Sequence, residues 1–267
     1  MNLSDAKHAF ITGGASGIGL GIATALASRG MAVTLADIDR EVLEEVVGKS
    51  QGRFRGHVLD TRDRPGWAAA KTEAEHALGP VDILVNNAGI APDGRELADM
   101  DPQSFDRIVA INLSGVFNGI ASFAADMRTR RKGHIVNTSS MAGLTALMFP
   151  RIGGYAAAKY AVVALSEVLR TEMAPHDVGV SVLCPGMVPT NLWQTTIKLG
   201  GRFPVPDGSE RSGAGVAQTH SLVSAADVGE IVARGITENL AYIITHPDDW
   251  PGVEQRMRAL EAAFLPR

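Results

Sequence analysis

The stretch TGGASGIG, residues Thr12–Gly19, decides the fold class of this chain. A short apolar run, His8–Thr12, leads into it, and a helical pattern rich in Ala, Leu and Ile, Gly17–Ser28, follows it. Glycine permits the tight turns and the close backbone approach that a bound anion needs. The start of the next helix adds free N–H groups and the positive end of its dipole. The stretch therefore predicts a strand, a phosphate-binding loop and a helix in succession.

The rest of the chain repeats this alternation of short apolar runs and longer helical patterns. The expected strands are His8–Thr12, Ala32–Ala36, Arg53–Leu59, Val81–Val85, His134–Thr138, Val180–Leu183 and Ala241–Thr245. The expected helices are Gly17–Ser28, Ile38–Gly48, Asp63–Leu78, Ser104–Arg131 (long enough for two), Tyr155–Ala174 and Ala225–Asn239. Nearly continuous Val, Ile and Leu in the runs are typical of parallel strands buried on both faces. We predict one α/β domain over residues 1–267, a Rossmann-type doubly wound parallel sheet of about seven strands with helices on both faces.

Two segments lie outside this alternation. Residues 189–222 are irregular and contain several glycines and prolines, and they follow a strand end, where such sheets bind ligands. We expect a substrate lid there rather than a passive surface loop. After Pro247 the chain is expected to end in a helical tail, at about Trp250–Phe264.

Composition excludes several classes of protein. The chain has 25 Lys and Arg against 29 Asp and Glu, a net charge of −4. Its densest basic cluster, residues 128–132, is expected to be the solvated end of a helix, so nucleic acid is a poor partner. The single cysteine, Cys184, fits a reducing compartment. With no signal-peptide pattern, no apolar run of membrane-spanning length and no metal-ligand cluster, we expect a cytoplasmic protein without a metal site.

An acid near the end of the second strand suggests which ligand the loop binds. Asp37 can accept hydrogen bonds from both hydroxyls of an adenosine ribose and would repel a 2′-phosphate, so NAD is favoured over NADP. Arg40 could soften this preference, and the alternative for Asp37 is an ordinary loop acid or helix cap. Asp39 is the more natural cap of the next helix. Asp60 could meet the adenine edge, with a plain turn residue as the alternative.

A tyrosine and a lysine four residues apart suggest the chemistry. Tyr155 and Lys159 share one face of a helix, and an ammonium near a phenol lowers the phenol pKa of about 10. The alternative is an exposed helix pair. Ser139 and Ser140 end the preceding strand and could hold a substrate oxygen near Tyr155. Asn112, an amide inside a helical pattern, is either functional or a surface residue.

Taken together, these pieces resemble the short-chain dehydrogenase/reductase family over about residues 6–190. The matching pieces, in family order, are TGGASGIG (12–19), Asp37, Asp60, NNAG (86–89), Asn112, the serines 139–140, YAAAK (155–159) and PGMVPT (185–190). The final THPDDW stretch is also similar to bacterial members that oxidise benzylic or other bulky secondary alcohols.

The resemblance implies a role for each matching residue. Tyr155 would be the general acid/base and Ser140 the catalytic serine. Lys159 would lower the tyrosine pKa and bind the nicotinamide ribose, and Asn112 would hold a water of a proton relay. The residues implied to bind the cofactor are Gly13, Ser16, Gly17, Ile18, Gly19, Asp37, Asp60, Asn86, Ala88, Gly89, Tyr155, Lys159, Pro185, Gly186, Val188 and Thr190. A homodimer or homotetramer is also implied.

Some features depart from the family pattern. Ser140 precedes Tyr155 by fifteen positions, where many members have thirteen, and the lid carries no motif that maps to a substrate. The glycine-rich ending of many members is missing, which leaves the usual tetramer packing open. An apolar pocket could be lined by Met141, Leu144, Leu147, Met148, Phe149, Trp193 and Phe203, although ordinary core packing accounts for them equally well.

We therefore expect an oxidoreductase that transfers a hydride between NAD(H) and a small to medium apolar or aryl secondary alcohol or ketone. An acyl-thioester ketone reductase and a non-catalytic dinucleotide sensor are the alternatives. The acidic balance weighs against the first, because no basic patch is present for coenzyme phosphates or a carrier protein. The presence of Asn112, Ser140, Tyr155 and Lys159 weighs against the second.

Overall fold

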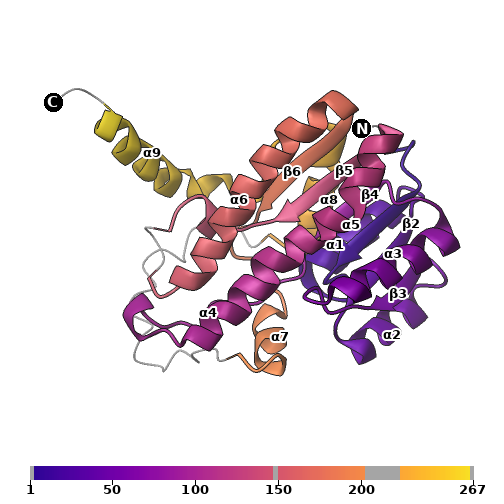
Figure 1. The fold of residues 1–267 in the computed structure, drawn as a ribbon, viewed down its shortest axis with the longest axis horizontal. Coiled ribbons are helices and arrows are strands. Elements are labelled where there is room, and N and C mark those ends of the chain that lie inside the picture. Colours follow the sequence, from indigo (N-terminus) through magenta and orange to yellow (C-terminus); the bar gives the residue numbers. More distant parts are fainter. Residues whose placement is uncertain (1–2, 147–149, 202–222, 265–267) are drawn as a thin grey trace.

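In the computed structural model, the described part of the chain contains seven strands, which lie in one parallel sheet (Figure 1). The structure describes residues 3–146, 150–201 and 223–264. The strands are β1 His8–Thr12, β2 Ala32–Asp37, β3 Phe54–Val58, β4 Ile83–Asn86, β5 Gly133–Thr138, β6 Val178–Cys184 and β7 Tyr242–Ile244. Their order, β3-β2-β1-β4-β5-β6-β7, reverses direction between β1 and β4. The expected doubly wound sheet is confirmed, with most strand ends displaced by one or two residues.

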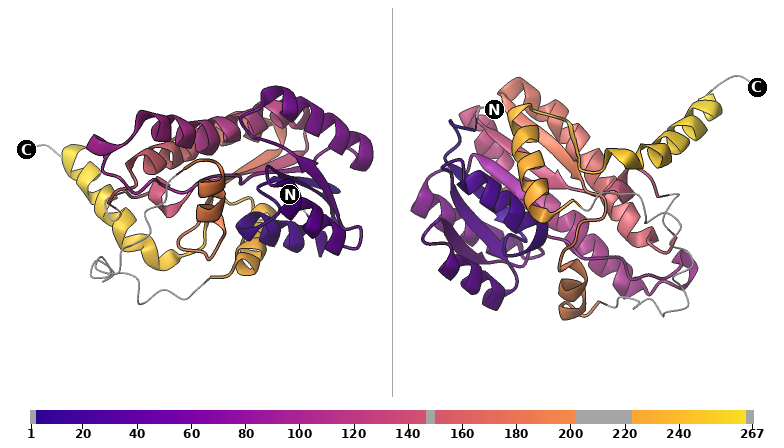
Figure 2. Two further views of the ribbon diagram at one scale, coloured as in Figure 1. Left: turned by 90° about the horizontal axis from the view of Figure 1, so that it is seen from below. Right: turned by 180° about the vertical axis from the view of Figure 1, so that it is seen from behind.

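Helices cover both faces of this sheet (Figure 2). The helices are α1 Gly17–Ala27, α2 Arg40–Lys49, α3 Arg64–Leu78, α4 Pro102–Val109, α5 Gly115–Arg130, α6 Gly153–Met173, α7 Leu192–Lys198, α8 Ala225–Thr237 and α9 Trp250–Phe264. On one face α1, α2 and α8 bury Ile22, Leu43 and Val232 against the strands. On the other, α3, α5 and α6 bury Trp67, Phe123 and Val162. Burial of such apolar side chains is the main force that holds these layers together.

Local signals explain several helix starts. Asp39 caps α2 by accepting a hydrogen bond from the Val42 N–H, as expected. Ser224 caps α8 in a reciprocal capping box with Asp227. The segment expected at Ser104–Arg131 does contain two helices, α4 and α5, joined without a break by one π-helical turn, Ala110–Ser114. Turns of this kind often mark functional sites.

The continuous helix 102–130 is long and apolar enough to cross a membrane, by length and composition alone. The sequence analysis found no run of that length. In the structure 44% of its most apolar window is buried inside the protein. Such burial is typical of a core helix that packs on a sheet.

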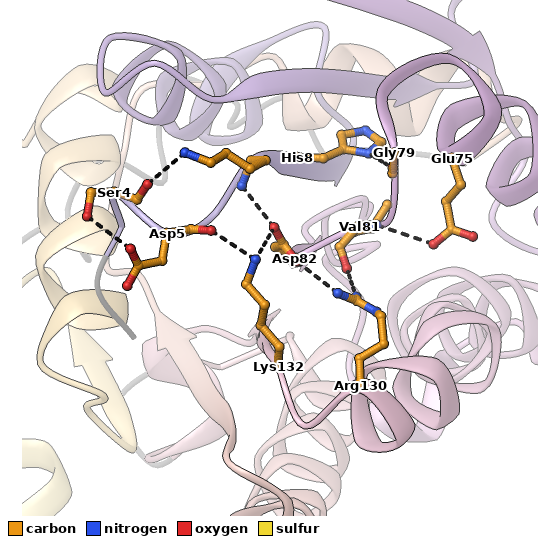
Figure 3. A network of polar contacts seen from close by, with 10 residues as sticks. Ser4, Asp5, His8, Glu75, Gly79, Val81, Asp82, Arg130 and Lys132 are labelled. Atoms are coloured by element: carbon orange, nitrogen blue, oxygen red, sulfur yellow. Dashed lines mark hydrogen bonds and ion pairs between the residues drawn. The ribbon is translucent and has the colours of Figure 1, made fainter.

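The basic cluster at residues 128–132 is not simply solvated, which corrects the sequence analysis (Figure 3). Arg130 and Lys132 both form ion pairs with Asp82, whose side chain is only 4% exposed. The backbone N–H of Lys7 donates to the same carboxylate. Burial raises the pKa of Asp82, but these donors outweigh that effect and hold it below its usual value. The cluster thus neutralises a buried acid that precedes β4.

The helical tail is confirmed as α9, which extends away from the rest of the molecule (Figures 1 and 2). Its Arg256 lies over the ring of Tyr160 in α6, 5.0 Å from the ring centroid. Of the expected lid, residues 189–201 are described and contain α7. Residues 202–222 lie outside the described residues.

Candidate active site

A cleft of about 440 Å³ opens at the carboxyl ends of the strands, around the point where the strand order reverses. Open α/β sheets bind ligands at this position. The expected site residues that line it are Gly13, Ser16, Gly17, Ile18, Asp37, Asp60, Ala88, Gly89, Ser140, Tyr155, Lys159, Pro185, Gly186, Val188 and Thr190. Residues far apart in the sequence are therefore brought to one edge of the sheet.

The glycine loop has the backbone geometry that its sequence requires. Gly17 has a positive φ of 50°, a conformation that side chains with a Cβ rarely adopt. A Cβ on Gly19 would lie 2.1 Å from the Gly13 carbonyl oxygen, so only glycine fits the close crossing of loop and helix. The Ser16 side chain makes no capping hydrogen bond, and the first turn of α1 faces the cleft. The backbone N–H groups at the start of α1 are thus not capped by Ser16 and can bind a pyrophosphate.

Three expected residues support the cleft from behind rather than lining it. Gly19 packs under the loop. Asn86 is buried in the sheet and donates to the Asn137 side chain at 2.9 Å, so its side chain does not line the cleft. Its neighbour Asn87, which the sequence analysis did not single out, lines the cleft and donates to the carbonyls of Thr12 and Gly13.

Asn112 is the third of these residues. It lies in the π-helical turn, fully buried, and exchanges two hydrogen bonds with the backbone of Ile90, at 2.8 and 2.9 Å. The surface reading of Asn112 is thereby wrong. A Cβ on Gly89 would lie 2.9 Å from the Asn112 Oδ1 and 3.7 Å from the Lys159 Nζ, so the two side chains approach one position beside Gly89.

Tyr155 and Lys159 lie in the first turns of α6 and both face the cleft. The exposed-pair alternative is wrong, because Lys159 is only 4% exposed and donates to the Thr138 carbonyl at 2.9 Å. Its ammonium lies 5.6 Å from the Tyr155 ring centroid. Burial lowers the pKa of Lys159 to about 8. A lysine of this kind changes its charge close to neutral pH.

The two serines have different contacts. Ser139 is buried and donates to the Lys159 carbonyl at 2.8 Å, which ties β5 to α6. Ser140 lines the cleft together with Tyr155, close enough to lower the Tyr155 pKa, and accepts from the Ala142 N–H at 3.1 Å. The Ser140 side chain therefore lies where a substrate oxygen could meet both hydroxyls.

The pKa of Tyr155 differs from the sequence expectation. Burial raises it above its usual value, and the hydrogen bond with Ser140 only partly opposes that effect. The Lys159 ammonium lies over the ring rather than at the hydroxyl. The i, i+4 spacing correctly places both groups on one face but does not specify which atoms meet.

The acids at the adenosine end have different neighbours. Asp37 accepts from the N–H groups of Ala15 and Asp39, each at 3.1 Å, while burial raises its pKa. Asp60 lines the cleft, but Arg62 binds both of its oxygens and lowers its pKa. Asp37 is therefore the acid better placed to accept from ribose hydroxyls.

The PGMVPT segment, residues 185–190, is held by contacts that the sequence analysis missed. The Gly186 N–H donates to Thr245 Oγ1 and His246 Nδ1, each at 3.2 Å. Thr190 lies against Gly17 in the glycine loop. The end of β7 thus orients the segment that closes the cleft beside Tyr155.

The apolar wall beside Tyr155 also differs from the expected one. Ile90, Ile111 and Leu199 line the cleft, and Tyr155 packs against the same cluster. Met141 is in the core and Leu144 packs on it, whereas Trp193 is 46% exposed. The other expected pocket residues, Leu147, Met148, Phe149 and Phe203, lie outside the described residues.

Comparison with known proteins identifies the family. The family model described as short chain dehydrogenase matches residues 7–198. This chain belongs to the short-chain dehydrogenase family.

Individual relatives agree with this assignment. A "C alpha-dehydrogenase" of Sphingobium sp. (strain NBRC 103272 / SYK-6) is 32% identical over 97% of this short-chain dehydrogenase and 86% of the relative. A D-beta-hydroxybutyrate dehydrogenase of Rhizobium meliloti (strain 1021) is 36% identical over 72% and 75%.

Among solved structures, a short chain dehydrogenase/reductase of Burkholderia phymatum in complex with NAD has a TM-score of 0.87. It is 32% identical and covers 100% of this chain and 98% of that one. The protein is thus a short-chain oxidoreductase, and its glycine loop, free helix start and Asp37 fit a dinucleotide cofactor.

Proposed function

We propose that this protein is an NAD-dependent dehydrogenase of apolar secondary alcohols that also reduces the corresponding ketones. The observation that carries the proposal is the Tyr155–Ser140 hydroxyl pair beside the apolar wall of Ile90, Ile111 and Leu199. The hydroxyl pair suits one carbinol or carbonyl oxygen, and the wall suits the apolar group on the same carbon. The name of the Sphingobium relative, which places dehydrogenation at a C alpha carbon, is consistent with such a substrate.

Each residue has a distinct task in the proposed reaction. Bound NAD supplies the hydride acceptor. Tyr155 takes the proton from the alcohol, and Ser140 holds the same oxygen by a second hydrogen bond. Lys159, whose ammonium lies over the Tyr155 ring, provides the positive charge that stabilises the phenolate form, which is the form that accepts this proton. Asn112, beside Gly89 and close to Lys159, supports the proton path from Lys159 toward solvent.

The preference for NAD is argued from Asp37. Its carboxylate can accept hydrogen bonds from both ribose hydroxyls, whereas a 2′-phosphate would meet it with like charge. The NAD complex of the Burkholderia phymatum protein supports this choice.

We also propose that the protein is cytoplasmic and that it forms a homodimer or homotetramer. The oligomer is argued from α5 and α6, which expose the apolar side chains of Phe117 and Val168. Gel filtration with light scattering tests the oligomer, and elution as a monomer would contradict it.

The test of the function is a spectrophotometric assay at the reduced-nicotinamide band. A panel of aliphatic and benzylic secondary alcohols is offered with NAD or NADP, and a β-hydroxyacyl thioester is included as the alternative substrate. We expect turnover of the apolar alcohols with NAD and none of the thioester. NADH binding without turnover of any alcohol in the panel would contradict the proposed substrate class.

A further inference from the structure

The short helix α7 connects the two ends of the cleft. It begins directly after the PGMVPT segment, next to Tyr155, and its residues Leu192, Thr195 and Lys198 line the same cleft as Asp37. Thr196 fastens it to the cleft wall by accepting from the Ala91 N–H at 2.8 Å. The last residue of α7, Lys198, reaches the adenosine end. In Figure 1, α7 lies apart from the helices that cover the sheet, on the same side as α4.

At the adenosine end Lys198 forms an ion pair with Asp39, the N-cap of α2. Asp39 first, then Glu41 and Asp37, raise the pKa of Lys198, and Lys198 in turn lowers the pKa of Asp39. The ammonium therefore lies in the field of three carboxylates, one of which is the proposed ribose ligand.

The other cations near this end are directed elsewhere. Arg40, which the sequence analysis expected to soften the preference for NAD, contacts Glu44 on the exposed side of α2. Arg62 is held by Asp60. Lys198 is thus the described cation that combines a position on the cleft with an acid partner at its rim. It is 62% exposed, so it can change partner at little cost.

We propose that Lys198 is a cofactor-specificity residue: helix α7 supplies a cation to the 2′ side of the adenosine ribose. With NAD, Lys198 stays on Asp39 and leaves Asp37 to the ribose hydroxyls. With NADP, it turns from Asp39 to the 2′-phosphate and offsets the repulsion by Asp37. This inference rests on the proposed dinucleotide binding, and it makes discrimination against NADP a balance between Asp37 and Lys198.

The test compares direct binding of NADH and NADPH, by nucleotide fluorescence titration, so it needs no substrate. In Lys198→Gln we expect the Kd for NADPH to rise by at most about fivefold, since an exposed ion pair contributes little. The Kd for NADH should change by less than about twofold. High salt should reduce the difference in the Kd for NADPH between the parent protein and Lys198→Gln.

A second variant should act in the opposite direction. Asp39→Asn keeps a good N-cap for α2, removes one negative charge and releases Lys198, so NADPH should bind more tightly than to the parent protein. Lys49→Gln is the control, because it breaks another lysine–carboxylate ion pair, a more exposed one with Glu45 in α2, and should change neither Kd.

The outcomes separate the possible failures. Equal weakening of NADH and NADPH in Lys198→Gln would overturn the inference, since Lys198 would then only fasten the lid. Unchanged NADPH binding would overturn it as well. Failure of the parent protein to bind either nucleotide would instead contradict the proposed function.

Discussion

The two edges of the sheet treat their charges in opposite ways. Near the amino ends of the strands, Asp82 is surrounded by Arg130, Lys132 and the Lys7 N–H, so its charge is fully satisfied (Figure 3). At the carboxyl ends, Asp37 and Tyr155 keep polar groups directed into an open cleft. A closed charge cluster stabilises the fold, whereas an open one has capacity left for a ligand. Loss of a group from the closed cluster should therefore lower stability, whereas loss of a group from the open cleft should lower activity.

The largest effect is expected at the open edge, on activity. Tyr155→Phe removes only the hydroxyl, and loss of a general acid/base typically costs 10²- to 10⁴-fold, so kcat should fall by about 10³-fold. Because phenylalanine keeps the ring that packs on the apolar cluster, the free energy of unfolding should change by less than about 1 kcal/mol. Steady-state kinetics and urea unfolding of the same preparations check both values. A parallel loss of stability would contradict the separation of the two edges.

The complementary variant changes the closed charge cluster around Asp82, near the amino ends of the strands. Asp82→Ala removes the buried partner of Arg130 and Lys132, which are 28% and 40% exposed, and loss of hydrogen bonds to a charged group costs about 1.5–3 kcal/mol. The free energy of unfolding should fall by about that amount, while kcat per folded molecule should stay near that of the parent. Urea titration followed by circular dichroism measures the first value, and active-site titration with NADH corrects the second.

The same cluster predicts a dependence on acid. The pKa of Asp82 in the folded protein lies below its usual value, so its contribution is present above the unfolded pKa, about 3.9. It is lost as the pH falls through the lower, folded pKa. The stability difference between the parent and Asp82→Asn should therefore shrink below about pH 4. A difference that is independent of pH would contradict the role of this carboxylate.

Lys159 lies in the open cleft at the carboxyl ends of the strands, and burial of its amine lowers the stability of the folded protein. Its folded pKa is about 8, whereas the unfolded value is about 10.4. Between these values the unfolded chain binds more protons, so the parent gains stability as the pH rises from about 8 to 10. Relative to Lys159→Met, this gain should amount to at most about 3 kcal/mol. Denaturant titrations at several pH values measure it, and a decrease over this window would show that the lysine is not buried as described.

The smallest of these effects is expected for Asp37, which acts on selectivity rather than on stability or rate. Asp37→Ala removes the acceptor for the ribose hydroxyls and the repulsion of a 2′-phosphate, so the ratio of kcat/KM with NAD to that with NADP should fall about tenfold. Asp60→Ala is a useful comparison, because Arg62 already occupies that carboxylate, and its ratio should change less. An unchanged ratio in Asp37→Ala would contradict our account of cofactor choice.

The parts of the site that could be predicted are those with local causes. The loop 12–19 joins a strand to a helix within a few residues, and Tyr155 and Lys159 share a face through one turn of α6. Periodicity, caps and glycine spacing express such short-range geometry directly. The family resemblance also indicated Ser140, which lines the cleft together with Tyr155.

What sequence alone determined is thus the succession of strands and helices, the glycine loop and the shared helix face of Tyr155 and Lys159, because each depends on neighbours within one or two turns. Only the tertiary structure decided that Asn86 and Asn112 lie behind the cleft, that Arg130 and Lys132 neutralise Asp82, and that Lys198 meets Asp39. Those contacts join segments far apart in the chain, and the packing of helices on the sheet, which no local pattern encodes, sets their partners.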